Sequence, residues 1–360
     1  MTLLIIVLVI LVFGLLVFVH ELGHFVVAKR AGVEVEEFGF GFPPRLVGVQ
    51  VGPTIYSLNW IPLGGFVRMK GESLSDLRPG TFGAASFWSK TRILFAGVTM
   101  NAATTYIVLL YLCLTGLPPV IANQVSIGHP SYAQSKQVMV LAVEPGSPAA
   151  AVSLQQGDLV LSGDGQAFTS EDQLMAFTKH HAGQQVTLRV SHQNSVRTLQ
   201  LRLRPASAKL GFLGVTPFQT DRLRYALGPA IATAAGITVQ LVWATLGAFI
   251  GLIVGLFAHG QVSGEVTGPV GIVVLLKNVV NLGLAYVLIV VASISISLAV
   301  INALPLPALD GGRWALTAAS WVARRRISER LETAINATGF AALILLMLVV
   351  TFFDIKRLHQ

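Results

Sequence analysis

The stretch "LLVFVHELGHFVVAKR", residues 15–30, places two histidines and a glutamate inside an otherwise apolar run. That run, residues 3–28, is longer than the about 20 apolar residues that a helix needs to cross a bilayer. An unpaired charge at that depth is costly, so ionisable side chains within a span indicate that they have partners. His20 and His24 are four positions apart, so both rings project from one face of a helix and can bind one metal ion.

Glu21 completes the pattern H-E-x-x-H. It lies one position along the helix from His20 and can reach a water molecule bound to the metal. Zinc lowers the pKa of such a water toward about 7, and a glutamate can then take its proton. A divalent cation and its ligands satisfy each other's charge, which explains three ionisable groups in a span. The sequence therefore predicts a catalytic zinc ion, one per chain.

Catalytic zinc usually has three protein ligands, so a third ligand is expected elsewhere in the chain. The metzincin pattern would require a glycine at position 27 and a histidine at position 30, where this chain has Val27 and Arg30. A glutamate just downstream is less favoured, because that segment lies beyond the end of the span in polar chain. The glutamates in question are Glu34, Glu36 and Glu37.

Asp310 is the favoured third ligand. It lies in "NALPLPALDGG", residues 302–312, where Pro305 and Pro307 stop an ordinary helix at the end of a later apolar span. Irregular backbone at membrane depth is tolerated only where it is buried in protein or lines a cavity. A polar active site needs such a place, so we expect Asp310 to meet the two histidines.

The composition is that of a membrane protein. Hydrophobic residues make up 53% of the 360 residues and charged residues only 12%, compared with about 25% charged residues in soluble domains. The net charge of +8 comes from lysines and arginines beside the apolar spans, without a basic stripe that alternates with aromatics. We therefore expect no nucleic-acid partner. The single cysteine, Cys113, excludes an intramolecular disulfide.

Basic residues orient the spans. The first run lacks a basic segment before it, so we expect a retained span and not a signal peptide. The lysines and arginines at 29–30, 90–92 and 324–326 should all be cytoplasmic. The uncharged stretch 226–258 must then contribute an even number of crossings. We favour no full crossing, with a tight pair of crossings as the alternative.

Residues 136–217 differ from the spans. They contain alternating strand patterns, Gly-Asp and Asp-Gly turns and a short amphipathic helix near 171–179, which predicts a compact domain on the outer side. Asp158 and Asp164 are expected to shape turns there. Alternation in 54–58 and 66–70, with two glycines between them, predicts a small strand pair or looped sheet.

The predicted segments are the first transmembrane helix (1–32), a cytoplasmic-side strand loop (33–89), the second transmembrane helix (90–118), an extracytoplasmic domain (119–217), an apolar connector that is surface-lying or re-entrant (218–283), the third transmembrane helix (284–318), and a basic loop with the last transmembrane helix (319–360).

Together these motifs resemble the site-2 protease family of intramembrane zinc metalloproteases. The closer match is its PDZ-bearing bacterial branch, of the type that regulates the sigma-E response. The resemblance rests on "HELGH" (20–24), "GFGF" (39–42), "IPLGGFVRMKGE" (61–72) and "NALPLPALDGG" (302–312). It implies a polytopic α-helical membrane protein with four core transmembrane helices, a membrane-associated β-hairpin loop and one α+β PDZ-like extracytoplasmic domain. It also implies the bacterial cytoplasmic (inner) membrane.

The resemblance assigns roles to matching positions. It implies zinc ligands at His20, His24 and Asp310, with Glu21 as the general base. Asn302 matches an asparagine that helps to hold the substrate backbone, and the 54–70 region resembles a strand loop that pairs with unwound substrate. "EPGSPAAAVSLQQGDLVLSGDGQ" resembles a PDZ fold, although relatives of this type usually carry two such domains and this chain has room for one. The implied substrate-binding residues are Asn302, Pro305, Pro307, Gly64, Gly65, Phe66 and Val67, and the implied PDZ ligand loop is Leu210, Gly211, Phe212, Leu213 and Gly214.

The predicted function is zinc-dependent endopeptidase activity on single-span membrane proteins, within or near their transmembrane segment. The resemblance suggests substrates already trimmed by another protease, such as anti-sigma factors or remnant signal peptides. The alternative is a PDZ membrane scaffold with a structural metal site, but such a site has no use for Glu21. A metal transporter is disfavoured because the spans carry almost no polar residues outside the two motifs. The expected partners are these substrates and membrane lipid.

Overall fold

The computed structural model describes residues 2–121, 123–133, 137–192, 195–207, 211–220, 222–259, 268–325 and 327–358. The chain forms two compact units. The first combines 1–108, 237–276 and 290–360, and the second combines 109–236 and 277–289. Both histidines of H-E-x-x-H and Asp310 belong to the first unit, so the site lies within one body.

Five helices of the described residues are long and apolar enough to cross a membrane. Four of them, α1, α2, α7 and α9, match the four predicted spans, and the fifth, α5, occupies the predicted apolar connector. A shorter apolar helix, α6, and an amphipathic helix, α8, complete the helical part. Their bounds are α1 (Thr2–Arg30), α2 (Phe87–Thr115), α5 (Leu227–His259), α6 (Pro269–Val280), α7 (Leu284–Ala303), α8 (Asp310–Ala323) and α9 (Glu329–Leu358).

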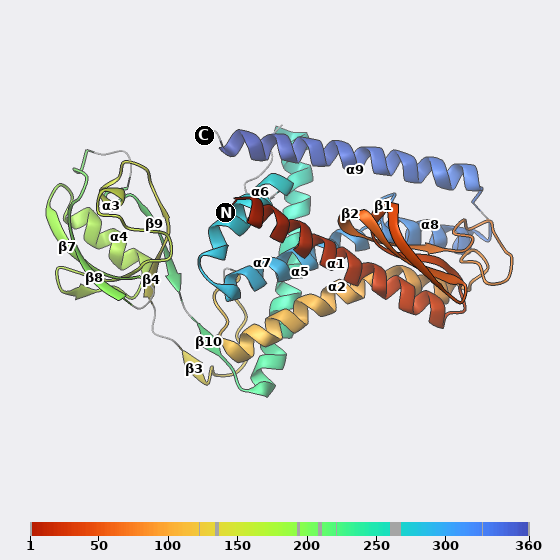
Figure 1. The fold of residues 1–360 in the computed structure, drawn as a ribbon, viewed down its shortest axis with the longest axis horizontal. Helices are drawn as coiled ribbons and strands as arrows, with labels where there is room; N and C mark the ends of the chain where they lie inside the picture. The colour runs from red at the N-terminus through yellow and green to blue at the C-terminus, as the bar shows by residue number, and fades with distance from the viewer. Residues whose placement is uncertain are drawn as a thin grey trace. The chain divides into compact units, whose positions relative to one another are not determined.

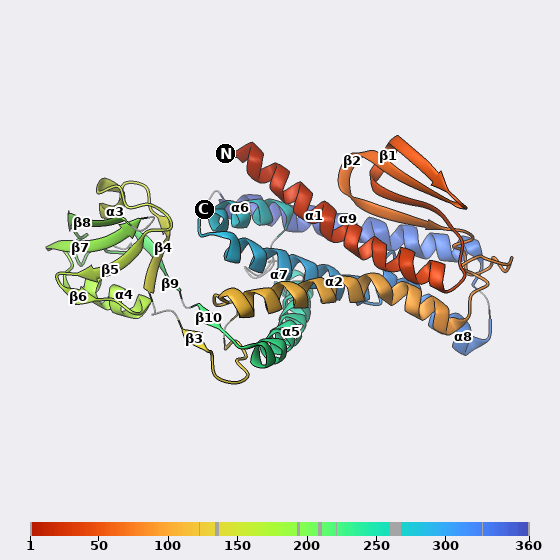
Figure 2. The same cartoon turned by 60° about the horizontal axis from the view of Figure 1, so that its bottom comes forward.

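Helix α5 is oriented differently from the other long helices of the first unit. The axes of α1, α2 and α9 lie roughly lengthwise in the view of Figure 1, with α1 running opposite to α2 and α9, whereas α5 from residue 237 onward crosses them steeply (Figures 1 and 2). It packs on α9 through a cluster that includes Leu252 and Val350. By length and composition α5 could itself cross a membrane, so the interpretation of 226–258 as a connector without a full crossing stays a prediction.

The strand region forms one sheet of two long, bent, antiparallel strands, β1 (Val35–Val51) and β2 (Thr54–Met69). Residues 35–40 pair with 65–69 on one side, and residues 37–40 also pair with 55–58 on the other. Residues 45–51 pair with 54–59. The two predicted runs, 54–58 and 66–70, therefore lie on opposite sides of residues 37–40, and β2 bends back on itself between them, as in the predicted looped sheet. Glycines make the bend possible: a Cβ on Gly64 would lie 2.8 Å from Val17 of α1, and one on Gly65 would lie 2.8 Å from the Gly39 carbonyl oxygen.

The second unit contains the predicted α+β domain. Its sheet has the order β8-β7-β5-β4-β9, with β6 paired to β5, and its core includes Leu174 and Phe177 of α4. Ser170 begins α4 by accepting a hydrogen bond from the Gln173 backbone N–H. The elements are β3 (Tyr132–Ala133), β4 (Gln137–Val143), α3 (Pro148–Ala151), β5 (Leu159–Gly163), β6 (Gln166–Ala167), α4 (Glu171–His180), β7 (Gln185–His192), β8 (Ser195–Arg202), β9 (Val215–Thr220) and β10 (Leu223–Arg224).

The two aspartates of this domain shape turns, as predicted. Asp158 is fully buried and accepts a hydrogen bond from the Gln155 backbone N–H at 3.0 Å. Asp164 lies in the turn between β5 and β6 with a left-handed φ of 46° and accepts a hydrogen bond from the Thr187 N–H of β7 at 2.8 Å. The turn between α6 and α7 packs on the same domain, where Leu282 and Tyr286 form a cluster with Met139.

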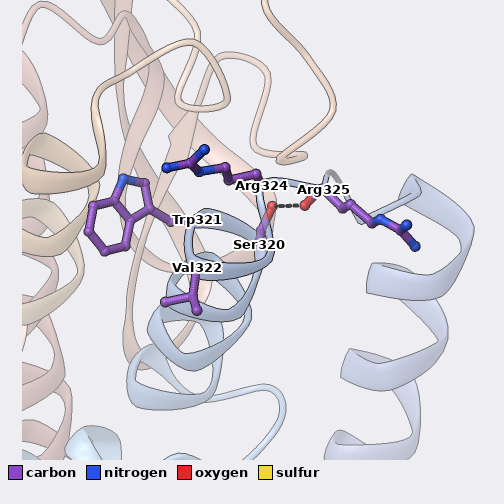
Figure 3. Close-up of a pocket in the computed structure, with 5 residues that line it drawn as sticks. All are labelled: Ser320, Trp321, Val322, Arg324 and Arg325. Carbon is purple, nitrogen blue, oxygen red and sulfur yellow. Dashed lines mark hydrogen bonds between the residues drawn. The ribbon is translucent and has the colours of Figure 1, made fainter.

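The end of α8 has the character of a membrane–water interface. Arg324 ends the helix in the left-handed conformation, and the Ser320 hydroxyl donates to the Arg325 carbonyl oxygen at 2.6 Å (Figure 3). Together with Val322, these residues line a cavity of about 620 Å³. Exposed Trp321 stacks on Phe87 of α2 at 4.7 Å between ring centroids. Aromatic and basic residues together are typical of such an interface, which agrees with the predicted basic loop.

Candidate active site

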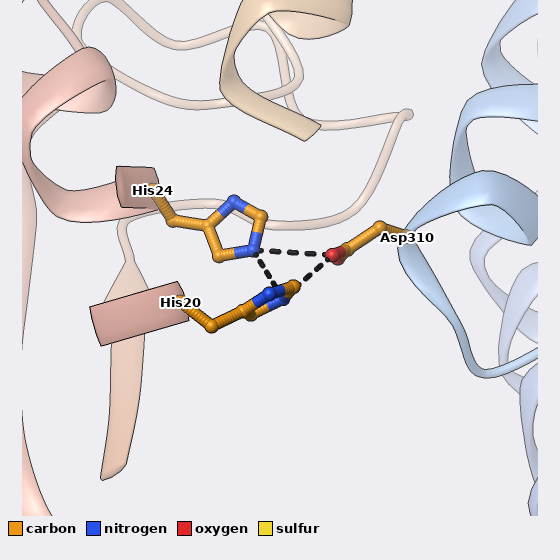
Figure 4. A group of neighbouring side chains, drawn as sticks. All are labelled: His20, His24 and Asp310. Atoms are coloured by element: carbon orange, nitrogen blue, oxygen red, sulfur yellow. Dashed lines mark hydrogen bonds and ion pairs between the residues drawn. The ribbon is translucent and has the colours of Figure 1, made fainter. Parts of the chain in front are cut away.

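Three side chains from two distant parts of the chain converge at the candidate site. His20 and His24 lie on α1, and Asp310 is the first residue of α8 (Figure 4). The two Nε2 atoms are 3.1 Å apart, and the Asp310 Oδ2 atom lies 2.9 Å from His20 Nε2 and 3.2 Å from His24 Nε2. Both histidines are only 6% exposed. The structure therefore brings together the three residues predicted to hold zinc.

The spacing of these atoms fits a metal site. Zinc with nitrogen and oxygen ligands at about 2.0–2.1 Å in tetrahedral geometry requires ligand atoms about 3.3 Å apart. The observed separations of 2.9–3.2 Å are close to this value. Two imidazoles and one carboxylate also leave a fourth position open, which is the donor set of a catalytic zinc site.

Tight backbone packing places Asp310 at the site. Helix α7 ends at Ala303, and α8 begins only at Asp310, after a loop that contains both prolines of the motif. A Cβ on Gly311 would overlap the Ala303 carbonyl oxygen, and one on Gly312 would overlap the Leu306 carbonyl oxygen. The two glycines after Asp310 therefore let the start of α8 fold back against the end of α7.

Helix α2 forms a wall of the site that the sequence analysis did not identify. The Ile93 carbonyl oxygen accepts a hydrogen bond from His24 Nδ1 at 2.7 Å, which leaves Nε2 of that ring for a metal. One turn later, a Cβ on Gly97 would lie 2.5 Å from His24 Nε2 and 2.6 Å from His20 Nε2. The space between the ligands thus exists because residue 97 has no side chain. Asn101, another turn along, contacts His20.

The predicted substrate strand lies beside the site. Gly64, Gly65, Phe66 and Val67 are in the second half of β2, and the Glu21 carboxylate is within hydrogen-bonding reach of the Val67 backbone N–H. Residues 65–69 pair with 35–40 on one side, and no strand of the described residues pairs with them on the other. An open strand edge therefore runs close to Glu21.

Asn302 lies at the C-terminal end of α7, before the loop that leads to Asp310. It is partly buried, and its amide makes no hydrogen bond to any described residue. Pro305 and Pro307 lie in the loop itself, where Pro307 packs against Gly339 of α9. These positions are compatible with the predicted contacts to a substrate backbone.

The rejected ligand candidates have other partners. Glu34 pairs with Lys70 at 2.8 Å, and Glu36 lies 3.4 Å from Arg68. Glu37 is buried in the sheet between two arginines, with Arg45 at 2.7 Å. Burial would raise the pKa of Glu37, but the hydrogen bonds from Ser57 and Arg45 and the charges of Arg45 and Arg68 outweigh burial and lower it.

A cavity of about 600 Å³ opens beside Asp310. The loop after β2 forms one wall and is held by α8 and α9: Arg313 donates to the Glu72 carbonyl oxygen at 2.8 Å, and Glu332 accepts from the Leu74 backbone N–H at 3.0 Å. Glu332 is only 6% exposed. The cavity is lined by Glu72, Ser73, Ala308, Leu309, Asp310, Arg313, Glu329, Glu332, Thr333, Asn336, Ala337 and Phe340.

The predicted ligand loop of the α+β domain is mostly described. Leu210 lies outside the described residues. The remainder, Gly211, Phe212, Leu213 and Gly214, leads into the edge strand β9 and is held by backbone hydrogen bonds, including Ala149 N–H to Leu213 oxygen at 3.1 Å. Ligand binding by this loop stays a prediction.

Comparison with known proteins agrees with the geometry of the site. The model of peptidase family M50 matches residues 8–346. The chain belongs to peptidase family M50. A putative zinc metalloprotease of Clostridium perfringens is 32% identical over 351 residues, which cover 96% of each chain. The regulator of sigma-W protease RasP of Bacillus subtilis is 26% identical, with 97% of each chain covered. The PDZ domain of an SdrC-like protein of Listeria monocytogenes is 29% identical, covers 22% of this chain and 85% of that domain, and has a TM-score of 0.20.

Family membership confirms several predictions. This protein is a zinc metalloprotease of the site-2 protease family, that is, a metalloendopeptidase that uses Zn²⁺. It is also a multi-pass membrane protein. The predicted fold class, a helical membrane protein with a strand sheet and one α+β domain, is also confirmed.

Sequence reasoning missed the contribution of α2. A carbonyl oxygen such as that of Ile93 leaves no sequence signal, and Gly97 is one of 35 glycines. Asn101 did have a signal, because a lone asparagine inside an apolar span is expensive unless it has a specific partner.

Proposed function

We propose that this zinc metalloprotease cleaves single-span membrane proteins within or beside their transmembrane segment. His20, His24 and Asp310 would hold the zinc ion, and Glu21 would act as general base. The observation that carries the proposal is the buried group of two imidazoles and one carboxylate, formed by helices that are apolar enough to lie in a membrane.

The chemistry follows from the residues around this group. Zinc, when bound, polarises the scissile carbonyl and lowers the pKa of a water molecule. Glu21 accepts the proton of the attacking water and passes it to the leaving amine. The polar cavity beside Asp310 offers water a place next to the site, which hydrolysis requires.

Substrate binding would use the open edge of β2. A helical substrate hides its carbonyl groups, so its backbone must be unwound before it is cleaved. The free edge of residues 65–69 can hold an unwound segment by β-augmentation. The amide of Asn302, which is partly buried, supplies a donor and an acceptor for the same backbone.

The substrate class rests on the relatives. The Bacillus subtilis relative is named as a regulator of sigma-W, which favours membrane-bound regulators such as anti-sigma factors, already trimmed by another protease. We place the protein in the bacterial cytoplasmic membrane with the α+β domain on the outer side. In this arrangement the Gly211–Gly214 loop of that PDZ-like domain would bind a chain end.

The test compares the full-length protein with Glu21→Gln in detergent, using a model single-span substrate. We expect Glu21→Gln to bind zinc like the wild type but to cleave about 10²–10⁴-fold more slowly, because general acid–base catalysis is lost. A chelator should abolish wild-type cleavage, and added zinc should restore it. Glu171→Gln, on helix α4 of the second unit, is the matched control and should behave as wild type.

Mass spectrometry of the products locates the cleaved bond. Wild-type activity in Glu21→Gln would refute the assigned base, and a bond far from the transmembrane segment would refute intramembrane cleavage. Zinc-loaded wild type that binds substrate without product would favour the scaffold alternative.

A further inference from the structure

Asn101 is a fully buried amide beside the zinc ligands. It lies on α2, and its Nδ2 atom is 3.4 Å from Nδ1 of His20. Its Oδ1 atom is buried and has no hydrogen-bond partner among the described residues. A buried polar atom without a partner is unfavourable, and each such group in a folded protein calls for an explanation.

The backbone around Asn101 is fixed to α7. The Asn101 carbonyl oxygen accepts a hydrogen bond from the Ser295 hydroxyl at 2.9 Å and another from the Thr105 hydroxyl at 3.1 Å. The Thr105 hydroxyl also lies 3.1 Å from the Ala292 carbonyl oxygen. These contacts hold α2 against α7 at this level, so the amide of residue 101 has a fixed position against the His20 ring.

The orientation of the His20 ring determines whether the Asn101 amide must present its oxygen or its nitrogen to His20 Nδ1. Its Nε2 atom points at His24 and Asp310 (Figure 4), so Nε2 must carry no proton when it binds a metal. The proton of the neutral ring is then on Nδ1, which becomes a donor and requires an acceptor. The two ends of an asparagine amide have nearly the same shape, so a half-turn of the amide presents oxygen in place of nitrogen.

The second histidine already has this arrangement. His24 Nδ1 lies 2.7 Å from the Ile93 carbonyl oxygen, on the same face of α2 and two turns before Asn101. Ile93, Gly97 and Asn101 are four residues apart, so they form one stripe along α2. Within this stripe, the Ile93 carbonyl oxygen orients His24 and Gly97 leaves room for the metal. Asn101 contacts His20.

We infer that Asn101 is a positioning residue of the zinc site, whose amide oxygen accepts the Nδ1–H hydrogen bond of His20 when the metal is bound. The hydrogen bond fixes the tautomer and the ring orientation that direct the Nε2 lone pair at the metal. This inference rests on the proposed function, because it takes His20 as a zinc ligand. Acceptors of this kind raise metal affinity, and their loss weakens it by roughly 10–100-fold.

The experiment measures zinc affinity of the full-length protein in detergent by competition with a chromophoric chelator. The variants are Asn101→Ala, which removes the acceptor, and Asn101→Asp, which keeps an oxygen at the same place. Thr104→Val is the matched control, since among the described residues the Thr104 hydroxyl donates only to the Met100 carbonyl oxygen of its own helix. The melting temperature of each metal-free variant is measured in parallel to report packing separately from metal binding.

We expect Asn101→Ala to bind zinc roughly 10–100-fold more weakly than the wild type, with Asn101→Asp within a few-fold of the wild type and Thr104→Val unchanged. Asn101→Ala with wild-type affinity would overturn the inference, even if its metal-free form melts at a lower temperature. Equal losses in the alanine and aspartate variants would also overturn it. His20→Ala separates the two proposals: if it binds zinc as tightly as wild type, the proposed zinc ligand itself is wrong.

Discussion

Replacing Gly97 with alanine tests whether α2 shapes the metal site. The new Cβ would lie 2.5 Å from His24 Nε2 and 2.6 Å from His20 Nε2. These distances are at least about 0.8 Å shorter than the 3.4 Å at which ordinary van der Waals contact begins. The added methyl group would therefore meet the two atoms that are proposed to bind zinc.

Neither helix can move away without losing other contacts. A Cβ on Gly23 would already lie 2.6 Å from the Ala96 carbonyl oxygen, so α1 and α2 are in close backbone contact here. Movement of α2 would also lengthen the 2.7 Å hydrogen bond from His24 to Ile93. The imidazoles must then shift by nearly 1 Å, and a functional site tolerates only about 0.5 Å. We expect a loss of zinc affinity of at least about 100-fold, or about 2.7 kcal/mol.

The assay is chelator competition on purified Gly97→Ala, with proteolysis of a model substrate as a second readout. Gly247→Ala is the matched control: Gly247 also lies in an apolar helix, but its Cβ would meet nothing within 4 Å. That control should keep wild-type affinity and be as stable or slightly more stable, because alanine favours a helix over glycine by roughly 0.5–1 kcal/mol. Gly97→Ala with wild-type zinc affinity would show that α2 does not limit the ligand space.

Three further results are expected. Glu332→Ala leaves the Leu74 N–H buried without its acceptor, which costs about 1–3 kcal/mol. Chymotrypsin should therefore cut after the exposed Leu77 about tenfold faster or more, whereas Glu329→Ala should not change the rate. Glu37 has a lowered pKa, so its contribution to stability is complete above its usual value of 4.5 and is lost as the pH falls through the lowered value. The protection of β1 amides against exchange, taken relative to the intrinsic exchange rate at each pH, should therefore fall on acidification in wild type and much less in Glu37→Gln. Removal of zinc by a chelator should lower the melting temperature, because a ligand present at 100 times its Kd stabilises the folded state by about 2.7 kcal/mol; an unchanged melting temperature would argue against a bound ion.

Local pattern was enough for the first half of the site. His20, Glu21 and His24 belong to one helix, and a helix has a fixed period, so four-residue spacing by itself places two rings on one face. Ionisable groups in a membrane span are unfavourable without partners, which indicated a metal ion. The same argument favoured Asp310, which is 290 residues away from His20, as the third ligand. The apolar spans and the α+β domain could likewise be predicted, because length and alternation are properties of a single segment.

The pairing of strands could not be predicted in the same way. The sequence pattern predicted two short runs, 54–58 and 66–70, but not their partner: residues 37–40 lie between the two runs and pair with both. The direction of α5 was equally hidden, since an uncharged helix shows the same composition whether it crosses a membrane or lies along it.

The sequence by itself therefore determined the ligand types, their spacing on α1 and the membrane character of the protein. Only the tertiary structure decided that Ile93, Gly97 and Asn101 form the facing wall of the site. The physical reason is that the period of a helix is set by its own backbone, whereas the approach of a carbonyl oxygen, a bare Cα or an amide to an imidazole depends on how closely two helices pack.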